Sequence, residues 1–193
     1  MESKARCNEA IAALGGLDCL VTNAGGPPTA PFEKAEDEDW DIAYQLNLMS
    51  AVRLIREALP ALKASGRGRI VNLTGYGVKE PITDLVVSDT VRAGVTVMAK
   101  TIASDLAPYG ITVNNIAPGP IMTDRLTEIF FARARSLGIA PEEQFKRFCE
   151  TIPVRRMGQP SEIGDLCAYL CSLQAGYLTG HTIVVDGGVN RSI

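Results

Sequence analysis

The sequence GRIVNLT at residues 68–74 is a short, largely apolar run that ends at Gly75, and it predicts a buried β-strand followed by a turn. Comparable runs occupy residues 17–23, 111–116 and 181–186. Helical patterns at residues 2–14, 37–65, 88–106, 124–150 and 160–173 surround them. We expect the second to break or kink at Pro60, and Ser161 to cap the last one. Strands that alternate with helices favour a parallel sheet covered on both faces. We therefore expect one doubly wound α/β domain over residues 1–193.

Composition limits the classes of partner. Hydrophobic residues make up 46% of the 193 residues and charged residues 21%, which is typical of a globular protein. The formal net charge of −3 offers no basic surplus for nucleic acid or an anionic membrane. The apolar runs are far shorter than the ~20 residues of a membrane helix, and residues 1–14 lack a signal-peptide core. We expect a cytoplasmic protein without nucleic-acid or membrane partners.

The five cysteines are odd in number and scattered: Cys7, Cys19, Cys149, Cys167 and Cys171. Cys167 and Cys171 are four residues apart, which places both thiols on one face of a helix. A zinc site needs four ligands, and the chain has a single histidine. We interpret the cysteines as small buried hydrophobic residues and expect no metal site.

Three of the predicted strands end in turns rich in Gly or Pro, at residues 23–26, 74–77 and 118–120. Ligands in doubly wound folds bind beyond the carboxyl ends of the strands, although each turn is also explained as a tight connection to the next helix. The turn at 74–77 is no dinucleotide fingerprint, because residues 79–81 (Lys-Glu-Pro) stand where a third Gly and a helix start belong. Neither G-x-G-x-x-G nor G-x-x-x-x-G-K-[ST] occurs, so the sequence lacks a recognisable diphosphate cradle.

Four motifs, in this order, resemble the short-chain dehydrogenase/reductase family, and within it the 3-oxoacyl-[acyl-carrier-protein] reductases. They are Thr22-Asn23-Ala24-Gly25, Leu46-Asn47-Leu48, Pro118-Gly-Pro-Ile-Met-Thr123, and Ile152-Pro-Val-Arg-Arg-Met-Gly158 with Gly180 and Val185-Asp-Gly-Gly188. The resemblance covers nearly the whole chain and implies a Rossmann-like fold.

The same resemblance implies a function and a site. It implies NAD(P)-dependent reduction of a small carbonyl or 3-oxoacyl compound by a homo-oligomer, with Asn47 as a catalytic residue. The implied cofactor-binding residues are Asn23, Ala24, Gly25, Pro118, Gly119, Ile121 and Thr123. The segment Leu126–Phe131 (Leu126, Ile129, Phe130, Phe131) would be a substrate lid or an ordinary packed helix.

The implied catalytic residues are altered. A gap-free alignment from Gly68 places the family's Ser at Gly75, its Tyr at Ser88 and its Lys at Arg92. A serine hydroxyl is a far weaker acid than a phenol beside a cation, and Arg does not release a proton as Lys does. Loss of one oxyanion donor costs about 3 kcal/mol. Thr74 and Tyr76 flank Gly75, and each is a candidate that could replace the missing donor in part.

The family's chain normally opens with a strand, a Gly-rich loop and a helix. At about 30 residues per βαβ unit, roughly sixty residues of that pattern are absent here. We expect a partial Rossmann-like domain that lacks the first strands and the Gly-rich loop, and weak binding of NAD or NADP. The strand at 17–23 would then be an unpaired edge that oligomerises or is covered, unless Met1 is internal to a longer protein.

Two functions follow. The first is an NAD(P)-dependent oxidoreductase whose chemistry is impaired in this chain. The alternative is a non-catalytic relative that acts as a binding or oligomer-forming subunit. The sequence does not reveal the substrate or the choice between NAD and NADP, because the selecting residue belongs to the absent part.

Overall fold

A parallel four-stranded sheet organises the chain, in a computed structural model that describes residues 2–27 and 29–192. The strands are β1 (Cys19–Thr22), β2 (Arg69–Leu73), β3 (Thr112–Pro118) and β4 (Thr182–Val185), in the order β1-β2-β3-β4. In this described part of the chain β1 is an edge strand, as expected. The alternative that Met1 is internal to a longer protein concerns a residue outside the described part of the chain.

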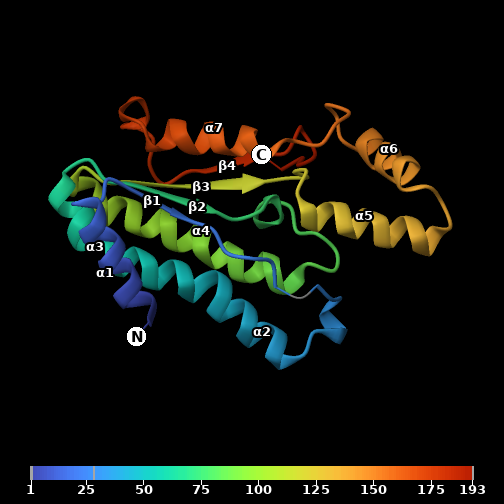
Figure 1. Cartoon of the computed structure of the whole chain (residues 1–193), viewed down its shortest axis with the longest axis horizontal. Helices are drawn as coiled ribbons and strands as arrows, with labels where there is room; N and C mark the ends of the chain where they lie inside the picture. The colour runs from blue at the N-terminus through green and yellow to red at the C-terminus, as the bar shows by residue number, and fades with distance from the viewer. Residues whose placement is uncertain (1, 28, 193) are drawn as a thin grey trace.

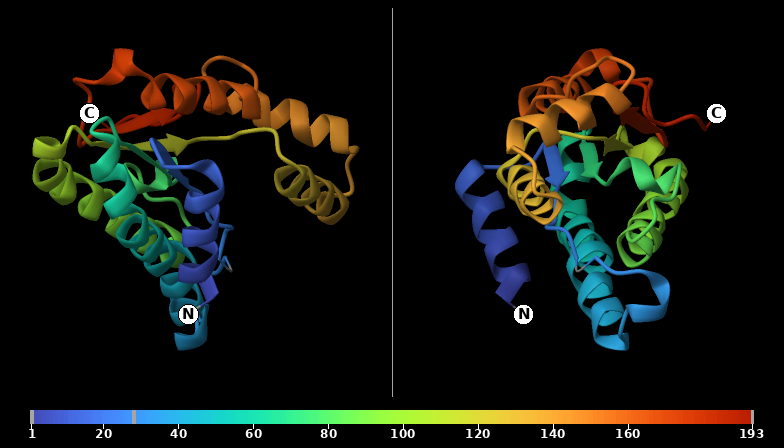
Figure 2. Two further views of the ribbon diagram at one scale, coloured as in Figure 1. Left: turned by 60° about the vertical axis from the view of Figure 1, so that its left-hand side comes forward. Right: turned by 90° about the vertical axis from the view of Figure 1, so that its right-hand side faces the viewer.

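Helices cover both faces of the sheet, which confirms the doubly wound α/β class (Figure 1). They are α1 (Glu2–Leu14), α2 (Asp37–Ala43), α3 (Ser50–Ser65), α4 (Val86–Leu106), α5 (Asp124–Leu137), α6 (Pro141–Thr151) and α7 (Pro160–Cys171). α3 and α4 pack on one face of the sheet over a shared apolar cluster, and α7 packs on the other face over a second cluster. Figures 1 and 2 show α5 and α6 beyond the carboxyl end of β3.

Two local expectations are wrong. The helical pattern of residues 37–65 does not break at Pro60, because α3 runs through this residue, which lies on the exposed side of the helix. Water can reach the carbonyl that Pro60 leaves unbonded there. The irregularity is instead the π-helical segment Tyr44–Met49. At α7 the N-cap is Gln159 rather than Ser161, because Gln159 and Glu162 form a reciprocal capping box.

A chain of side-chain hydrogen bonds crosses all four strands. The Thr22 hydroxyl donates to Asn72 Oδ1 at 2.7 Å, Asn72 Nδ2 donates to Asn115 Oδ1 at 2.9 Å, and Asn115 Nδ2 donates to Thr182 Oγ1 at 3.0 Å. These residues are also direct partners in the strand register. Asn72 and Asn115 are completely buried, so each polar group must find its partner inside the sheet. A slip of one residue would turn the series to the opposite face, so the ladder specifies the register.

We expect Asn72→Leu to lower the free energy of unfolding by roughly 2–4 kcal/mol, because the Thr22 hydroxyl and Asn115 Oδ1 are then buried without partners. The matched control is Thr182→Val, which removes only the terminal acceptor and should cost about 1 kcal/mol. Urea unfolding measures both. Equal losses in the two variants would show that the ladder does not act as a connected unit.

Candidate functional site

A cavity of about 610 Å³ opens beyond the carboxyl ends of the strands. Every site residue predicted from the sequence, except Asn47, lines it: Asn23, Ala24, Gly25, Ser88, Arg92, Pro118, Gly119, Ile121 and Thr123. The turn after β1 and the segment after β3 therefore face the same space as the first turns of α4. The structure thus brings together residues that lie up to a hundred positions apart in the sequence.

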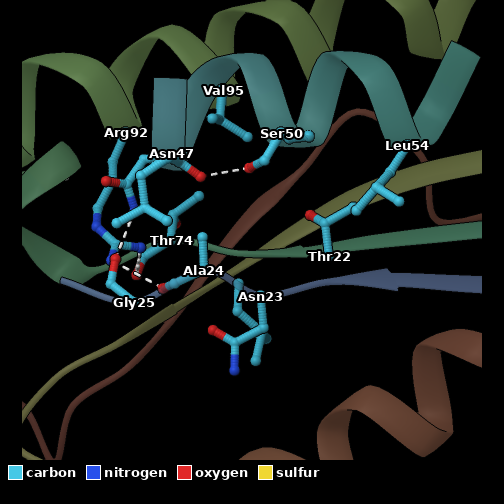
Figure 3. Close-up of a pocket in the computed structure, with 13 residues that line it drawn as sticks. Thr22, Asn23, Ala24, Gly25, Asn47, Ser50, Leu54, Thr74, Arg92 and Val95 are labelled. Atoms are coloured by element: carbon cyan, nitrogen blue, oxygen red, sulfur yellow. Dashed lines mark hydrogen bonds between the residues drawn. The ribbon is translucent and has the colours of Figure 1, made fainter. Parts of the chain in front are cut away.

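Asn47 lines an adjoining cavity of about 270 Å³, which shares Asn23, Ala24, Gly25 and Arg92 with the larger one (Figure 3). Asn47 lies in the π-helical segment, where the wider turn alters the direction of its side chains. Its Nδ2 donates to the Gly25 carbonyl at 2.8 Å. Its Oδ1 is buried and has no protein partner among the described residues. A buried oxygen without a protein partner can accept a hydrogen bond from a water molecule or from a polar group of a ligand.

Arg92 joins α4 to the ends of two strands. Its Nη1 donates to the Thr74 carbonyl at 2.9 Å. Its Nη2 donates to the carbonyls of Ala24 and Gly25 at 3.4 and 3.3 Å. Its Nε donates to the Ser88 hydroxyl at 3.2 Å, so the two residues aligned with the family's Tyr and Lys contact each other. A guanidinium in this position holds the turns together but is always protonated, so it does not relay protons.

Gly75 lies beside this contact and has space for a side chain. Its backbone is extended, with φ −177° and ψ 152°, which any residue adopts. A Cβ built on Gly75 would meet only Arg92 Cδ, at 3.9 Å, an ordinary van der Waals contact. The hydroxyl that the family resemblance places here is therefore absent for reasons other than lack of room.

Thr74 and Tyr76, the two alternative hydroxyl donors, differ in whether their hydroxyl groups are free to reach the cavity. The Thr74 hydroxyl is buried and donates to the Ile116 carbonyl at 3.1 Å, so it is committed to β3. Tyr76 lines the large cavity. Burial raises the pKa of its phenol, and the negative charges of Asp89 and Asp186 raise it further. Tyr76 therefore remains protonated and can donate a hydrogen bond, but it is a weaker acid than a phenol beside a lysine.

Asp89 fixes the loop that leads from Tyr76 into α4. Its Oδ2 accepts a hydrogen bond from the Ile82 backbone N–H at 2.9 Å, and its carboxyl lies so close to Gly77 that a Cβ there would be 2.2 Å from Oδ1. The loop residues Ile82 and Leu85 add apolar surface to the cavity. Burial raises the pKa of Asp89, and this effect exceeds the lowering by the Ile82 N–H and Arg92.

The apolar side of the cavity comes from the region after β3. The Thr123 hydroxyl caps α5 by accepting a hydrogen bond from the Leu126 N–H. Of the lid residues predicted from the sequence, Leu126 lines the cavity, Phe130 is buried behind it, Phe131 is exposed, and the Ile129 side chain is outside the described part of the chain. Phe148 of α6 also lines the cavity and packs edge-on against Phe130, with ring centroids 4.9 Å apart.

Sequence reasoning missed the contributions of Phe148, Ile82 and Leu85. The aromatic spacing in α6 was a signal for Phe148, but only the folded chain shows which side of α6 faces the site. The residues that the structure describes contain no group of three or more His, Cys, Asp or Glu arranged to hold a metal ion. No helix among them combines the length and apolar character needed to cross a membrane.

We expect Asp89→Asn to change how stability depends on pH. The pKa of Asp89 is higher in the folded chain than in the unfolded chain, so its contribution to stability is complete below the unfolded pKa and is lost as pH rises through the folded pKa. Asn keeps an acceptor for the Ile82 N–H and does not titrate. In urea unfolding, the wild type should therefore lose stability relative to Asp89→Asn as pH rises from about 4 upward. A constant difference across that range would contradict the assignment.

Comparison with known proteins identifies relatives over almost the entire chain. A family model described as enoyl-(acyl carrier protein) reductase matches residues 2–190. Nodulation protein G of Azospirillum brasilense is 36% identical over 188 residues, which is 97% of this chain and 72% of that protein. The 7α-hydroxysteroid dehydrogenase of Escherichia coli (strain K12) is 33% identical over 187 residues, which is 97% of this chain and 69% of that protein.

The fold is also similar to that of solved reductase structures. The crystal structure of L-sorbose reductase from Gluconobacter frateurii, in complex with NADPH and L-sorbose, superposes with a TM-score of 0.92 at 28% identity. That match covers 98% of this chain and 72% of the reductase. Together with the cavity at the strand ends, these matches show that the chain belongs to the short-chain dehydrogenase/reductase family of NAD(P)-dependent oxidoreductases.

Proposed function

We propose that this chain holds the nicotinamide end of NAD or NADP together with a small carbonyl compound, and that it reduces the carbonyl slowly. The observation that carries the proposal is the cavity in which Asn23, Ala24 and Gly25 face the segment Pro118–Thr123. The relative that was solved with NADPH and a sugar substrate supports the same assignment.

The residues present suit the nicotinamide end of the cofactor. A Cβ built on Gly25 meets no atom within 4 Å, so the backbone there borders open space that a flat ring can occupy. The unpaired Asn47 Oδ1 next to it offers a polar contact. The sequence contains no Gly-rich diphosphate loop, so we expect these residues alone to bind the dinucleotide weakly.

Slow chemistry follows from the groups around the carbonyl. Bound NADPH or NADH would supply the hydride. The chain must then stabilise the developing oxyanion and deliver a proton, and Ser88 with Arg92 stands where the family resemblance places a phenol and a lysine. An ordinary serine hydroxyl donates a hydrogen bond but transfers its proton poorly at neutral pH. The hydrogen bond that a side chain at Gly75 would provide is also absent.

A second candidate function is a non-catalytic subunit that binds a ligand or forms a homo-oligomer in the cytoplasm. The Arg92 contacts favour it, because the guanidinium already binds three backbone carbonyls within the site. The exposed Val21 on the edge strand β1 also favours it, since an open strand edge is a template for association. Light scattering of the purified chain, combined with a turnover assay, separates the two candidates.

The first test is binding. We expect NADPH or NADH to bind saturably to the wild type in a fluorescence titration, and Gly25→Leu to weaken binding at least about tenfold by filling the space over the turn. The matched control is Gly164→Leu on α7, where an added Cβ also meets no atom within 4 Å. Equal affinities for Gly25→Leu and Gly164→Leu, or no saturable binding by the wild type, would remove the cofactor assignment.

The second test restores the family's catalytic groups. We expect the triple variant Gly75→Ser, Ser88→Tyr, Arg92→Lys to raise kcat/KM for a 3-oxoacyl thioester or a simple ketone by about 100-fold or more. The control carries Ala in place of Ser at position 75, which adds the same Cβ without the hydroxyl. It should fall about 100-fold below the triple variant. If circular dichroism shows all proteins folded and none gains activity, the second candidate function is favoured.

A further inference from the structure

Three thiols from distant parts of the sequence meet at the edge of the sheet, on the face covered by α7. Cys19 opens β1 and is exposed, whereas Cys167 and Cys171 lie on α7 and are half-buried. The side chains of Cys19 and Cys167 both lie close enough to the Cys171 thiol to raise its pKa. The Cys19 Sγ also lies 3.7 Å from the Cys171 carbonyl oxygen. The interpretation of all five cysteines as buried hydrophobic residues is therefore wrong for Cys19.

The geometry distinguishes the Cys19–Cys171 pair from the Cys167–Cys171 pair. Residues four apart on a regular helix have Cβ atoms about 5–6 Å apart, whereas a disulfide needs about 3.8 Å. A bond between Cys167 and Cys171 would therefore require α7 to distort. Cys19 comes from a separate strand and approaches the last residue of α7 from the side. A bond between Cys19 and Cys171 leaves the turns of α7 intact.

We propose that Cys19 and Cys171 form a reversible disulfide when the protein meets a peroxide, and that this bond ties the edge strand β1 to α7. The cysteine pair at the open edge of the sheet is thus an oxidation site, and the chain has it in addition to the proposed carbonyl-reducing site.

The chemistry balances with hydrogen peroxide as the oxidant. The exposed Cys19 thiol attacks one peroxide oxygen, the O–O bond breaks, and Cys19 sulfenic acid and one water form. The Cys171 sulfur then attacks the Cys19 sulfur, the S–O bond breaks, and a second water leaves with the S–S bond in place. Two thiols lose two electrons and two protons in total, and the peroxide is reduced to two waters. A small dithiol reductant reverses the reaction by exchange.

Burial accounts for the order of these steps. It raises the pKa of Cys171 to about 12, and the neighbouring thiols add to this effect, so Cys171 stays protonated and is not the first thiol to react with the peroxide. In the second step the Cys171 proton passes to the hydroxide that leaves Cys19, which gives the second water. Burial also raises the pKa of Cys167. The accessible Cys19 is therefore the first target of a soluble oxidant.

Peptide mapping after peroxide treatment tests the proposal. Remaining thiols of the oxidised protein are alkylated, and the digest is compared with and without reduction. We expect a Cys19–Cys171 linked peptide in the wild type and in the matched control Cys167→Ser, and none in Cys19→Ser or Cys171→Ser. A Cys167–Cys171 or Cys19–Cys167 peptide in place of the expected one, links only between chains, or Cys19 oxidised to sulfinic acid without any link would each overturn it.

A thermal measurement provides an independent readout. The link closes a loop of more than 150 residues, so oxidation should raise the melting temperature of the wild type by roughly 5 °C or more, and dithiothreitol should reverse the rise. Cys7→Ser and Cys149→Ser lie outside the cluster and should keep the shift. An equal shift in Cys19→Ser would show that another reaction causes it.

Discussion

The buried ladder of Thr22, Asn72, Asn115 and Thr182 is the constraint on which the rest of this structure depends. An asparagine amide can accept from one strand and donate to the next, so two asparagines connect four strands in one polarised series. Leucine or valine in those positions would pack as well but would not distinguish the correct register from a slipped one. The ladder therefore fixes which residues stand at the strand ends, and those residues line the cavity.

The ladder and the site share the same face of the sheet. Thr22 is the end of the ladder and also lines the smaller cavity next to Asn47. One residue further, the chain enters the turn whose carbonyls at Ala24 and Gly25 accept hydrogen bonds from Arg92, and Gly25 accepts another from Asn47. The register of β1 therefore fixes where the turn begins, and hydrogen bonds from Arg92 of α4 and Asn47 of the π-helical segment fix its carbonyl groups. These contacts explain how the chain's own residues shape the cavity.

The Arg92 contacts hold together the turns that line the proposed site. A lysine at this position would present one compact charge, whereas the planar guanidinium reaches two strand ends at once. Its hydrogen bonds stabilise the arrangement of the turns independently of any ligand. The guanidinium also donates to the Ser88 hydroxyl, so the same side chain connects the start of α4 to the two strand ends.

The amino-acid sequence alone was enough to predict the alternation of strands and helices, the family, and most of the residues that line the larger cavity. Local patterns carry that information, because apolar periodicity and turn residues act over a few positions. It did not reveal the helix irregularity at Tyr44–Met49 in place of Pro60, the ladder, the contribution of Phe148, or the meeting of Cys19 with Cys171. Each of these depends on which side chains approach one another across different elements. Only the tertiary structure decides such contacts, because the sequence spacing of two residues does not fix their distance once the chain crosses between strands and helices.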